Sequence, residues 1–325
     1  MRCQVAGTGA WLPERVLTNA DLEKMVETND EWIVSRTGIR ERRLAAKEEH
    51  TSTMGARAAA AALEAAGVAA SEVEMILCAT ITPDMPFPCT ACLIQKEIGA
   101  SRAFCFDLEA ACTGYIYGLE VGRRFIESGA YKTVLVVASD KLSSITDWKD
   151  RNTCVLFGDG ASAALLRPST GAREILSASL GASGEQAGLL YMPGGGAQHP
   201  ASAKTVEQGL HFLKMNGREV YKHAVVNMAR ASEEAIARAG FKPTDIAWII
   251  PHQANLRIIQ GLAERLELGM ERCVVNLDRY GNISAASAGI ALHEAVCDGR
   301  LKKGDLLLLV AFGAGLTWGA AVLRW

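Results

Sequence analysis

The chain has 325 residues and a formal net charge of −2; 49% of its residues are hydrophobic and 22% are charged. A chain of this length and apolar content can bury a large core, which excludes a disordered protein and fits one large or two ordinary domains. The near-neutral charge provides no long-range attraction for nucleic acid or an anionic membrane, so we expect neither as a partner.

Two further features of the composition point to the cytoplasm. No apolar run reaches the roughly 18 residues of a membrane span, and the first residues lack the basic start and apolar centre of a signal peptide. Nine cysteines lie scattered along the chain, which suits a reducing compartment without a disulfide framework. Cys89-Thr-Ala-Cys92 is the nearest approach to a zinc pattern, and because no second pair follows it we expect no metal.

Short apolar runs alternate with alanine-rich stretches of helical period along the chain. The runs predict strands and the stretches predict helices, and their alternation predicts an α/β protein. In chain order, the expected elements are a helix at 54–66, strands at 73–79 and 103–108, a helix at 115–128, a strand at 133–138, a helix at 225–239, and strands at 247–250 and 306–311.

Several segments of the first half recur in the second half in the same order. VLFGDGASAALLR (155–167) returns as VAFGAGLTWGAAVLR (310–324), and each copy predicts a strand, a glycine-rich turn and a second strand. Residues 73–84 parallel 246–257, and residues 127–140 parallel 297–313. The shared order indicates a duplicated unit, and we expect two halves, 1–170 and 171–325, that pack face to face.

Cys112 lies where the predicted strand 103–108 gives way, through small residues, to a helix. At a helix N-terminus the dipole and the free amides favour a thiolate, so the position predicts a cysteine pKa lowered toward neutrality and a nucleophile. A buried, inert cysteine is the usual alternative for any one of nine. The small residues on both sides favour the nucleophile here.

His252 and Asn282 occupy comparable positions in the second half. His252 follows the predicted strand 247–250 and precedes a helix, and Asn282 lies at a glycine turn that leads into another helix. Each residue alone is more often structural. Because Cys112 and Asn282 stand at equivalent turns of a duplicated unit, however, pseudo-symmetry brings both toward one central cleft.

Five motifs give the chain a resemblance to a known family. They are TNDEWIVSRTGIRER (28–42), AACTGY (110–115), IIPHQANLRI (249–258), DRYGNISAAS (278–287) and AFGAGLTWGAA (311–321). Together they resemble the β-ketoacyl-acyl-carrier-protein synthase III family along the whole chain. The resemblance implies a thiolase-like fold of two αβαβα halves in a five-layered α-β-α-β-α body, a homodimer, and the decarboxylative condensation of an acyl-coenzyme A starter with malonyl-acyl-carrier protein.

The resemblance also implies the catalytic roles. Cys112 would hold the starter acyl group, and His252 and Asn282 would donate hydrogen bonds to the enolate oxygen formed by decarboxylation. The backbone amides of Cys112 and Ala314 would form a second oxyanion site. A glycine is common at the position of Ala314 in the family, but alanine keeps the amide donor. The family needs no metal or resident cofactor, since coenzyme A and phosphopantetheine arrive with the substrates.

Residues of substrate entry are assigned partly by spacing and partly by resemblance. Lys214, Arg218 and Lys222 recur every fourth residue, which predicts a basic face on one helix if that helix continues past Gly217, although an ordinary solvated surface explains the spacing as well. The resemblance implies that such a face and Arg257 meet the acidic carrier protein. It also implies a coenzyme A site, whose residues are Trp32, Arg36, Arg151, Gly217 and Asn255.

The acyl pocket is assigned by resemblance alone. Phe87 matches the position where the partner subunit closes the pocket, and Leu156 and Phe157 would add to its wall. A bulky ring at 87 favours a short starter such as acetyl. Pocket shape discriminates weakly between neighbouring homologues, at about 1 to 3 kcal/mol for one methylene.

Three alternatives remain open from the sequence. A related condensing enzyme of secondary metabolism that joins two acyl-coenzyme A molecules would use the same three residues. A Cys/His acyl-thioesterase would need an activated water, and no carboxylate stands beside His252 in its motif. A non-catalytic scaffold would have no need for the reactive residues.

Overall fold

The computed structural model describes all residues, 1–325, and contains one large sheet system, two small two-stranded sheets and ten α-helices. The strands are β1 (Cys3–Trp11), β2 (Arg15–Thr18), β3 (Glu41–Leu44), β4 (Met75–Ala79), β5 (Phe104–Leu108), β6 (Val134–Lys141), β7 (Asp159–Pro168), β8 (Glu174–Ala182), β9 (Leu190–Tyr191), β10 (Lys214–Met215), β11 (Trp248–Pro251), β12 (Leu306–Gly313) and β13 (Thr317–Arg324). The helices are α1 (Asn19–Leu22), α2 (Asp30–Thr37), α3 (Thr51–Ala66), α4 (Thr90–Ile98), α5 (Gly114–Glu127), α6 (Ala203–Glu207), α7 (Gly217–Arg238), α8 (Leu256–Arg265), α9 (Leu277–Tyr280) and α10 (Ala286–Cys297). None of the helices is long and apolar enough to span a membrane.

The large sheet has the strand order β11-β12-β13-β8-β1-β7-β6-β4-β5. A single residue pair, Gln4 with Glu174, joins β1 to β8, whereas β1 with β7 and β8 with β13 each form eight residue pairs. The sheet is therefore two separate sheets that meet at one edge.

Both sheets have the same connectivity. In the first, β4 runs parallel to β5 and β6, and β7 lies antiparallel between β6 and β1. In the second, β11 runs parallel to β12, and β13 lies antiparallel between β12 and β8. A parallel bridge from Ile249 to Cys273 takes the place of the β4–β5 pair. The identical order supports the duplication inferred from the sequence.

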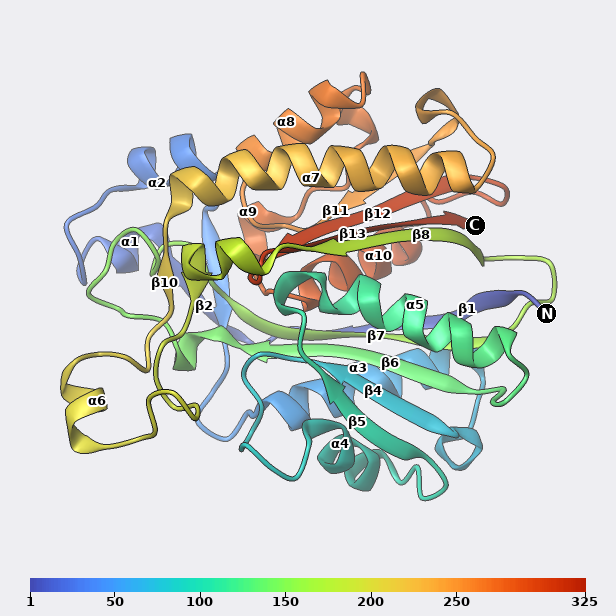
Figure 1. The fold of residues 1–325 in the computed structure, drawn as a ribbon, viewed down its shortest axis with the longest axis horizontal. Coiled ribbons are helices and arrows are strands. Elements are labelled where there is room, and N and C mark those ends of the chain that lie inside the picture. Colours follow the sequence, from blue (N-terminus) through green and yellow to red (C-terminus); the bar gives the residue numbers. More distant parts are fainter.

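The helices cover both faces of the two sheets and form five layers, visible from top to bottom in Figure 1. Helices α5 and α10 lie between the sheets, and their apolar residues belong to the largest buried cluster together with residues of both sheets. A second cluster joins α7 and α8 to the second sheet, and a third joins α3 and α4 to the first. The five-layered α-β-α-β-α arrangement confirms the expected fold class.

Small residues explain how closely these layers approach. Gly7 and Gly9 of β1 face α3. A Cβ atom on Gly7 would lie 2.3 Å from the Ala62 carbonyl oxygen, and one on Gly9 would lie 2.2 Å from the Ala58 carbonyl oxygen. The alanine-rich side of α3 completes this contact, since it presents methyl groups in place of longer side chains. Packing of this kind fixes the distance between helix and sheet.

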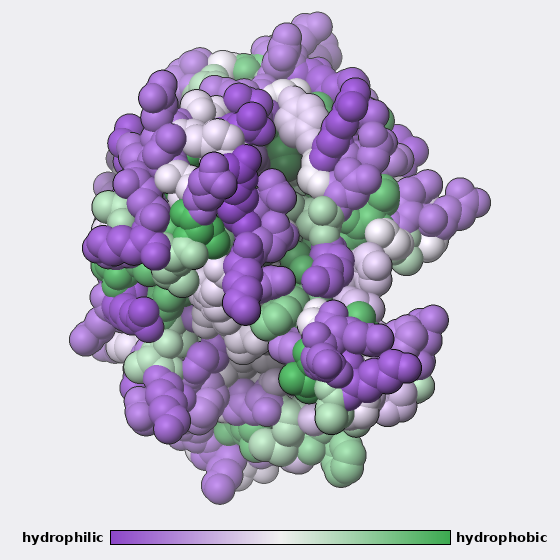
Figure 2. All heavy atoms as spheres, turned by 90° about the vertical axis from the view of Figure 1, so that its left-hand side faces the viewer, coloured by the Kyte–Doolittle hydropathy of each residue, from purple (hydrophilic) through white to green (hydrophobic).

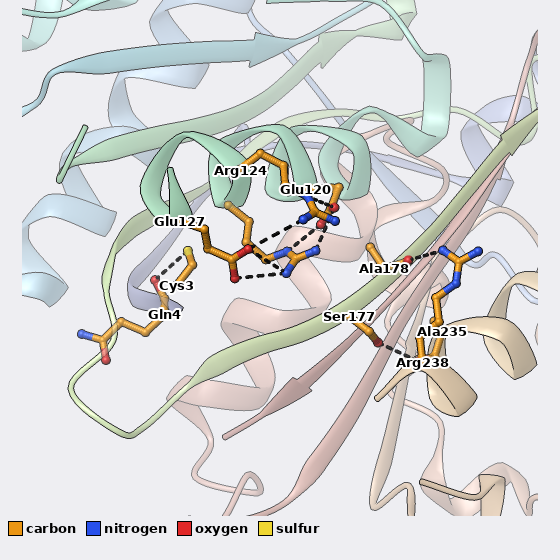
Figure 3. Close-up of polar contacts among 10 residues, drawn as sticks. Cys3, Gln4, Glu120, Arg124, Glu127, Ser177, Ala178, Ala235 and Arg238 are labelled. Carbon is orange, nitrogen blue, oxygen red and sulfur yellow. Dashed lines mark hydrogen bonds and ion pairs between the residues drawn. The ribbon is translucent and has the colours of Figure 1, made fainter. Parts of the chain in front are cut away.

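Polar contacts hold the outer ends of the layers, as Figure 3 shows. On α5, Arg124 forms an ion pair with Glu120 at 2.7 Å, and Arg123 pairs with Glu120 at 2.7 Å and with Glu127 at 3.1 Å. On the other side, the Ser177 hydroxyl of β8 donates to the Ala235 carbonyl of α7 at 2.6 Å. The ion pairs of α5 lie at the end of that helix opposite to Cys112.

The predicted elements match the structure closely, with one difference in the repeat. The second copy has a strand, a turn and a strand, formed by β12 and β13. In the first copy only β7 is a strand, and residues 155–157 form turns that end in one bridge from Phe157 to Asn282. The expectation of a strand at 155–157 is therefore wrong. These residues pair with the other half instead of extending the first sheet.

Candidate active site

A cavity of about 530 Å³ opens between the two halves. It is lined by 31 residues, 22 of them hydrophobic, and Cys112, His252 and Asn282 all contribute to its wall. Figure 2 faces this end of the molecule and shows apolar atoms deep between hydrophilic side chains. The three predicted catalytic residues thus meet in one largely apolar cavity, a setting that strengthens hydrogen bonds to a developing charge.

Cys112 lies in the short 3-10 turn Ala111–Thr113 that runs directly into α5. The preceding Ala111 has a φ of 45°, a conformation that a non-glycine residue rarely adopts. This sharp turn after β5 exposes the half-buried thiol to the cavity. The arrangement matches the expected strand-to-helix elbow with the nucleophile at a helix start.

The turn between β12 and β13 locks this elbow from the other half. The Thr113 hydroxyl donates to the Ala110 carbonyl at 2.6 Å, and the Thr317 hydroxyl lies 2.9 Å from the Thr113 hydroxyl and 3.2 Å from the same carbonyl. A Cβ atom on Gly313 would lie only 2.7 Å from the Cys112 backbone nitrogen. Residue 313 must therefore be glycine for the turn that carries Ala314 to approach Cys112 this closely.

The electrostatic prediction for Cys112 is wrong. Burial raises the pKa of the Cys112 thiol to about 12, although the Ser284 hydroxyl acts in the opposite direction. The apolar wall disfavours the thiolate more strongly than the helix start favours it. In the free protein Cys112 is consequently a thiol at neutral pH, and its proton must leave as the substrate reacts.

His252 follows β11 and is buried, and its backbone nitrogen donates to the Val310 carbonyl of β12 at 2.8 Å. Burial lowers the pKa of His252 to about 3. The imidazole is therefore neutral at physiological pH and carries one N–H donor. A neutral donor is the form that the sequence analysis required.

Asn282 is fixed by residues of the first half. Its backbone nitrogen donates to the Leu156 carbonyl and its carbonyl accepts from the Gly158 nitrogen, both at 2.9 Å. The side-chain oxygen accepts from the Ser284 backbone nitrogen at 2.9 Å. Because that bond occupies the oxygen, the amide NH2 remains to donate to a ligand. Ser284 was not singled out from the sequence, although it lies two residues beyond Asn282 in the same motif.

The predicted coenzyme A residues form two connected groups at the mouth. The Arg36 and Arg151 guanidinium groups lie 4.8 and 5.1 Å from the centre of the Trp32 ring. Asn255 lines the cavity and donates to the Arg36 backbone carbonyl at 3.0 Å. Gly217 also lines the cavity. The Trp32 ring and the two arginines are not part of the cavity wall, and they connect to it through the bond from Asn255 to Arg36.

The basic face is only partly as expected. Helix α7 begins at Gly217, with Asn216 as its N-terminal cap, so Lys214 lies in β10 and not on the helix. The prediction of three basic residues on one helical face is therefore wrong for Lys214. Arg218 and Lys222 do share α7, with Lys222 paired to Glu219 at 2.7 Å.

Arg257 stands near this face but on another element. It belongs to α8, which packs against α7, and its guanidinium donates to the Ser35 carbonyl of α2 at 3.0 Å. The predicted carrier-protein residues thus come from β10, α7 and α8, and not from one helix.

The predicted acyl-pocket residues separate into two groups. Leu156 and Phe157 line the cavity as expected. Phe87 does not contribute to its wall, and 83% of its surface is exposed on the loop before α4. The sequence analysis did not identify several further apolar residues of the wall, because they come from loops and helices without a shared motif: Ile145, Leu190, Met192, Leu213, Met215 and Met228.

The sequence of this chain is similar to families and proteins that are already known. Residues 106–184 match the family described as 3-oxoacyl-[acyl-carrier-protein] synthase III, and residues 236–325 match the family of its C-terminal region. A β-ketoacyl-[acyl-carrier-protein] synthase III of Roseiflexus sp. (strain RS-1) is 57% identical, over 99% of this chain and 98% of its own length.

Solved structures agree with this relationship. The structure of a β-ketoacyl-[acyl-carrier-protein] synthase III from Thermus thermophilus is 48% identical, with a TM-score of 0.92 and 99% of each chain covered. The priming β-ketosynthase of the R1128 polyketide pathway is 36% identical, with a TM-score of 0.92, over 99% of this chain and 96% of its own.

Proposed function

The chain belongs to the β-ketoacyl-acyl-carrier-protein synthase III family of condensing acyltransferases, and on that premise we propose how its residues divide the reaction. The activity joins an acyl group to a malonyl thioester with loss of CO2. One observation carries the proposal: a thiol, a neutral imidazole and an oriented amide face the same apolar cavity.

In the first half-reaction Cys112 takes the starter acyl group from coenzyme A. The sulfur attacks the thioester carbonyl, the bond from that carbon to the coenzyme sulfur breaks, and the thiol proton ends on the coenzyme. Because burial raises the Cys112 pKa, the thiol keeps its proton until the substrate is bound. The product is a neutral thioester that suits the apolar wall.

In the second half-reaction the malonyl thioester loses CO2, and negative charge develops on its thioester oxygen. The His252 N–H and the Asn282 NH2 are the two donors that stabilise this enolate, each worth on the order of 3 kcal/mol of barrier. Neither donor carries a charge, so neither holds the malonyl carboxylate by an ion pair. The enolate carbon then attacks the acyl carbonyl carbon, the bond from that carbon to the Cys112 sulfur breaks, and the released Cys112 thiolate takes a proton from solvent.

The oxyanion formed in that attack lies near the turn after β12. We assign its stabilisation to the backbone amides of Cys112 and Ala314, supported by the contact of Gly313 with the Cys112 nitrogen. Nothing in this sequence of steps requires a metal or a resident cofactor.

Substrates are proposed to enter past α2, α7 and α8. Trp32 with Arg36 and Arg151 would hold the nucleotide, since an indole stacks on a base and guanidinium groups bind phosphate. Gly217 and Asn255 would line the path of the pantetheine arm. The acidic carrier protein would dock on Lys214, Arg218, Lys222 and Arg257.

We further propose a cytoplasmic homodimer that favours a short starter such as acetyl. The assignment rests on the family relationship, and the Phe87 ring, 83% exposed, leaves an apolar surface that a second chain can cover. We also propose that residues 1–170 and residues 171–325 form two thiolase-like halves. The matching strand orders of their sheets support this division.

Two other functions make different predictions. A condensing enzyme of secondary metabolism is favoured by the 36% identity to a priming β-ketosynthase of a polyketide pathway, and it would prefer malonyl-coenzyme A or another carrier. A Cys/His thioesterase would release free acid without any malonyl thioester.

The test is intact-protein mass spectrometry with a mixture of acetyl-, isobutyryl- and longer acyl-coenzyme A, followed by addition of malonyl-acyl-carrier protein. We expect one acyl adduct, absent from Cys112→Ser, that disappears on addition of the malonyl substrate with formation of 3-ketoacyl-carrier protein. Absence of an adduct with every donor would remove the first half-reaction.

A further inference from the structure

Gln253, the residue after His252, uses its whole side-chain amide for hydrogen bonds. It is only 1% exposed. Its Nε2 donates to the carbonyls of Pro251 at 2.8 Å and Val274 at 2.9 Å. Its Oε1 accepts from the nitrogens of Asn276 at 3.0 Å and Leu277 at 3.2 Å. Two donors and two acceptors are thus all satisfied by backbone groups.

This pattern can be met by no other natural side chain at that position. The partners are two carbonyls and two N–H groups, so the orientation of the amide is fixed. Glutamate keeps the acceptor oxygens but donates to neither carbonyl when ionised, and methionine has a similar length without either function. Buried backbone groups left without partners are costly.

The four bonds connect the segments that carry the two donors. Pro251 ends β11 and His252 follows it, whereas residues 274–277 run beside β11, with the Val274 nitrogen donating to the Ile249 carbonyl at 2.9 Å. From Leu277 the chain forms the single turn of α9 and reaches Asn282 five residues later. One side chain therefore links the backbone at His252 to the segment that leads to Asn282.

Cys112 is held by different contacts. Its turn is fixed by Thr113, Thr317 and the close approach of Gly313, and none of these residues bonds Gln253. A substitution at residue 253 should thus displace His252 and Asn282 more than it displaces Cys112.

We propose that Gln253 is a positioning residue that sets the spacing of the His252 and Asn282 donors and so controls the decarboxylation half-reaction. This inference rests on the proposed division of labour between Cys112 and the donor pair. Two donors serve one enolate oxygen only if both reach it together, and a displacement of about 1 Å can cost about 100-fold in rate.

The experiment compares Gln253→Met and Gln253→Glu with the unchanged enzyme in three measurements: the rate of Cys112 acylation by acetyl-coenzyme A, CO2 release from malonyl-acyl-carrier protein, and the melting temperature. Ser177→Ala is the matched control, because it removes one buried hydrogen bond, to the Ala235 carbonyl, on the outer side of the second sheet. Using two variants covers the case in which one of them fails to fold.

We expect kcat for CO2 release to fall about 10- to 100-fold in both variants, with the KM for the malonyl substrate and the acylation rate within about twofold. In the Ser177→Ala control, the ratio of the acylation rate to the rate of CO2 release should equal that of the unchanged enzyme. Unchanged CO2 release in a folded variant would overturn the proposal, and so would a parallel loss of both half-reactions. Failure of the proposed function would instead be visible in the unchanged enzyme, as absence of the adduct or of CO2 release.

Discussion

The turns that precede α5 and α10 are equivalent parts of the two halves and carry different chemistry. Each contains a non-glycine residue of positive φ, Ala111 at 45° and Ser284 at 46°. The first turn presents the Cys112 thiol, and the second presents the amide of Asn282, whose oxygen is held by the Ser284 nitrogen. The same backbone conformation thus presents a thiol in one half and an amide in the other, to which we assign the roles of nucleophile and hydrogen-bond donor.

Each turn is also held by the opposite half. Gly313 and Thr317 of the second half contact the Cys112 turn, whereas Leu156 and Gly158 of the first half bond the Asn282 backbone. Neither half contains a complete site. The difference between the turns therefore predicts effects that separate the two half-reactions.

The largest separation is expected from Asn282→Ala. Loss of one oxyanion donor should lower CO2 release from the malonyl thioester about 100- to 1,000-fold, with Cys112 acylation within about twofold. Quenched time courses of CO2 release and of Cys112 acylation measure the two rates. Asn227→Ala, which removes an amide on α7 that bonds the His223 carbonyl, is the control. Equal loss of both steps would show that Asn282 also serves acyl transfer.

The next effect is the pH dependence of Cys112 alkylation. Since the thiol pKa is raised to about 12, its thiolate fraction should rise about tenfold per pH unit from pH 7 to 9, with no plateau. Iodoacetamide labelling followed by peptide mass mapping of Cys112 measures this rate. A plateau near pH 8 would show that the helix start lowers the pKa as the sequence alone suggested.

The nucleophile turn can also be disturbed from the other half by Gly313→Ala. The added methyl group would meet the Cys112 nitrogen at 2.7 Å, so we expect acylation to fall about tenfold and stability to fall by about 1 to 3 kcal/mol. Acylation kinetics and urea unfolding measure the two quantities. Gly196→Ala, where a Cβ meets nothing within 4 Å, should change neither. Full activity of the Gly313 variant would contradict the described contact.

The smallest effect is expected at the cavity mouth. Trp32→Ala removes the ring beside Arg36 and Arg151, and should raise the KM for acyl-coenzyme A about threefold to tenfold with kcat unchanged. The KM for malonyl-acyl-carrier protein serves as the internal control. A fall in kcat without a change in KM would place Trp32 outside the coenzyme site.

The sequence predicted the elements that carry the site because its motifs lie at the ends of strongly periodic segments. The strand runs and most of the alanine-rich helices appear within a few residues of their expected bounds, although the helix expected at 225–239 begins at Gly217. Cys112, His252 and Asn282 line one cavity as expected. The ordered repeat made the central cleft predictable, since it related turns that are 170 residues apart in the chain.

The predictions that were wrong concern properties that depend on contacts between distant segments of the chain. The pKa of Cys112 is set by desolvation from a wall assembled out of both halves, and the pattern at residues 110–115 shows only the helix start. Lys214 leaves the helix because Asn216 caps α7 ahead of Gly217. Residues 155–157 pair with Asn282 of the other half, a contact that periodicity within one half cannot reveal.

The division of labour between the two turns is tested most directly by following two readouts in the same samples of Cys112→Ala and Asn282→Ala. These are the acyl adduct by intact mass and CO2 release from malonyl-acyl-carrier protein. The account predicts opposite patterns: no adduct with retained CO2 release for Cys112→Ala, and a full adduct with lost CO2 release for Asn282→Ala. Loss of both readouts in both folded variants would contradict it.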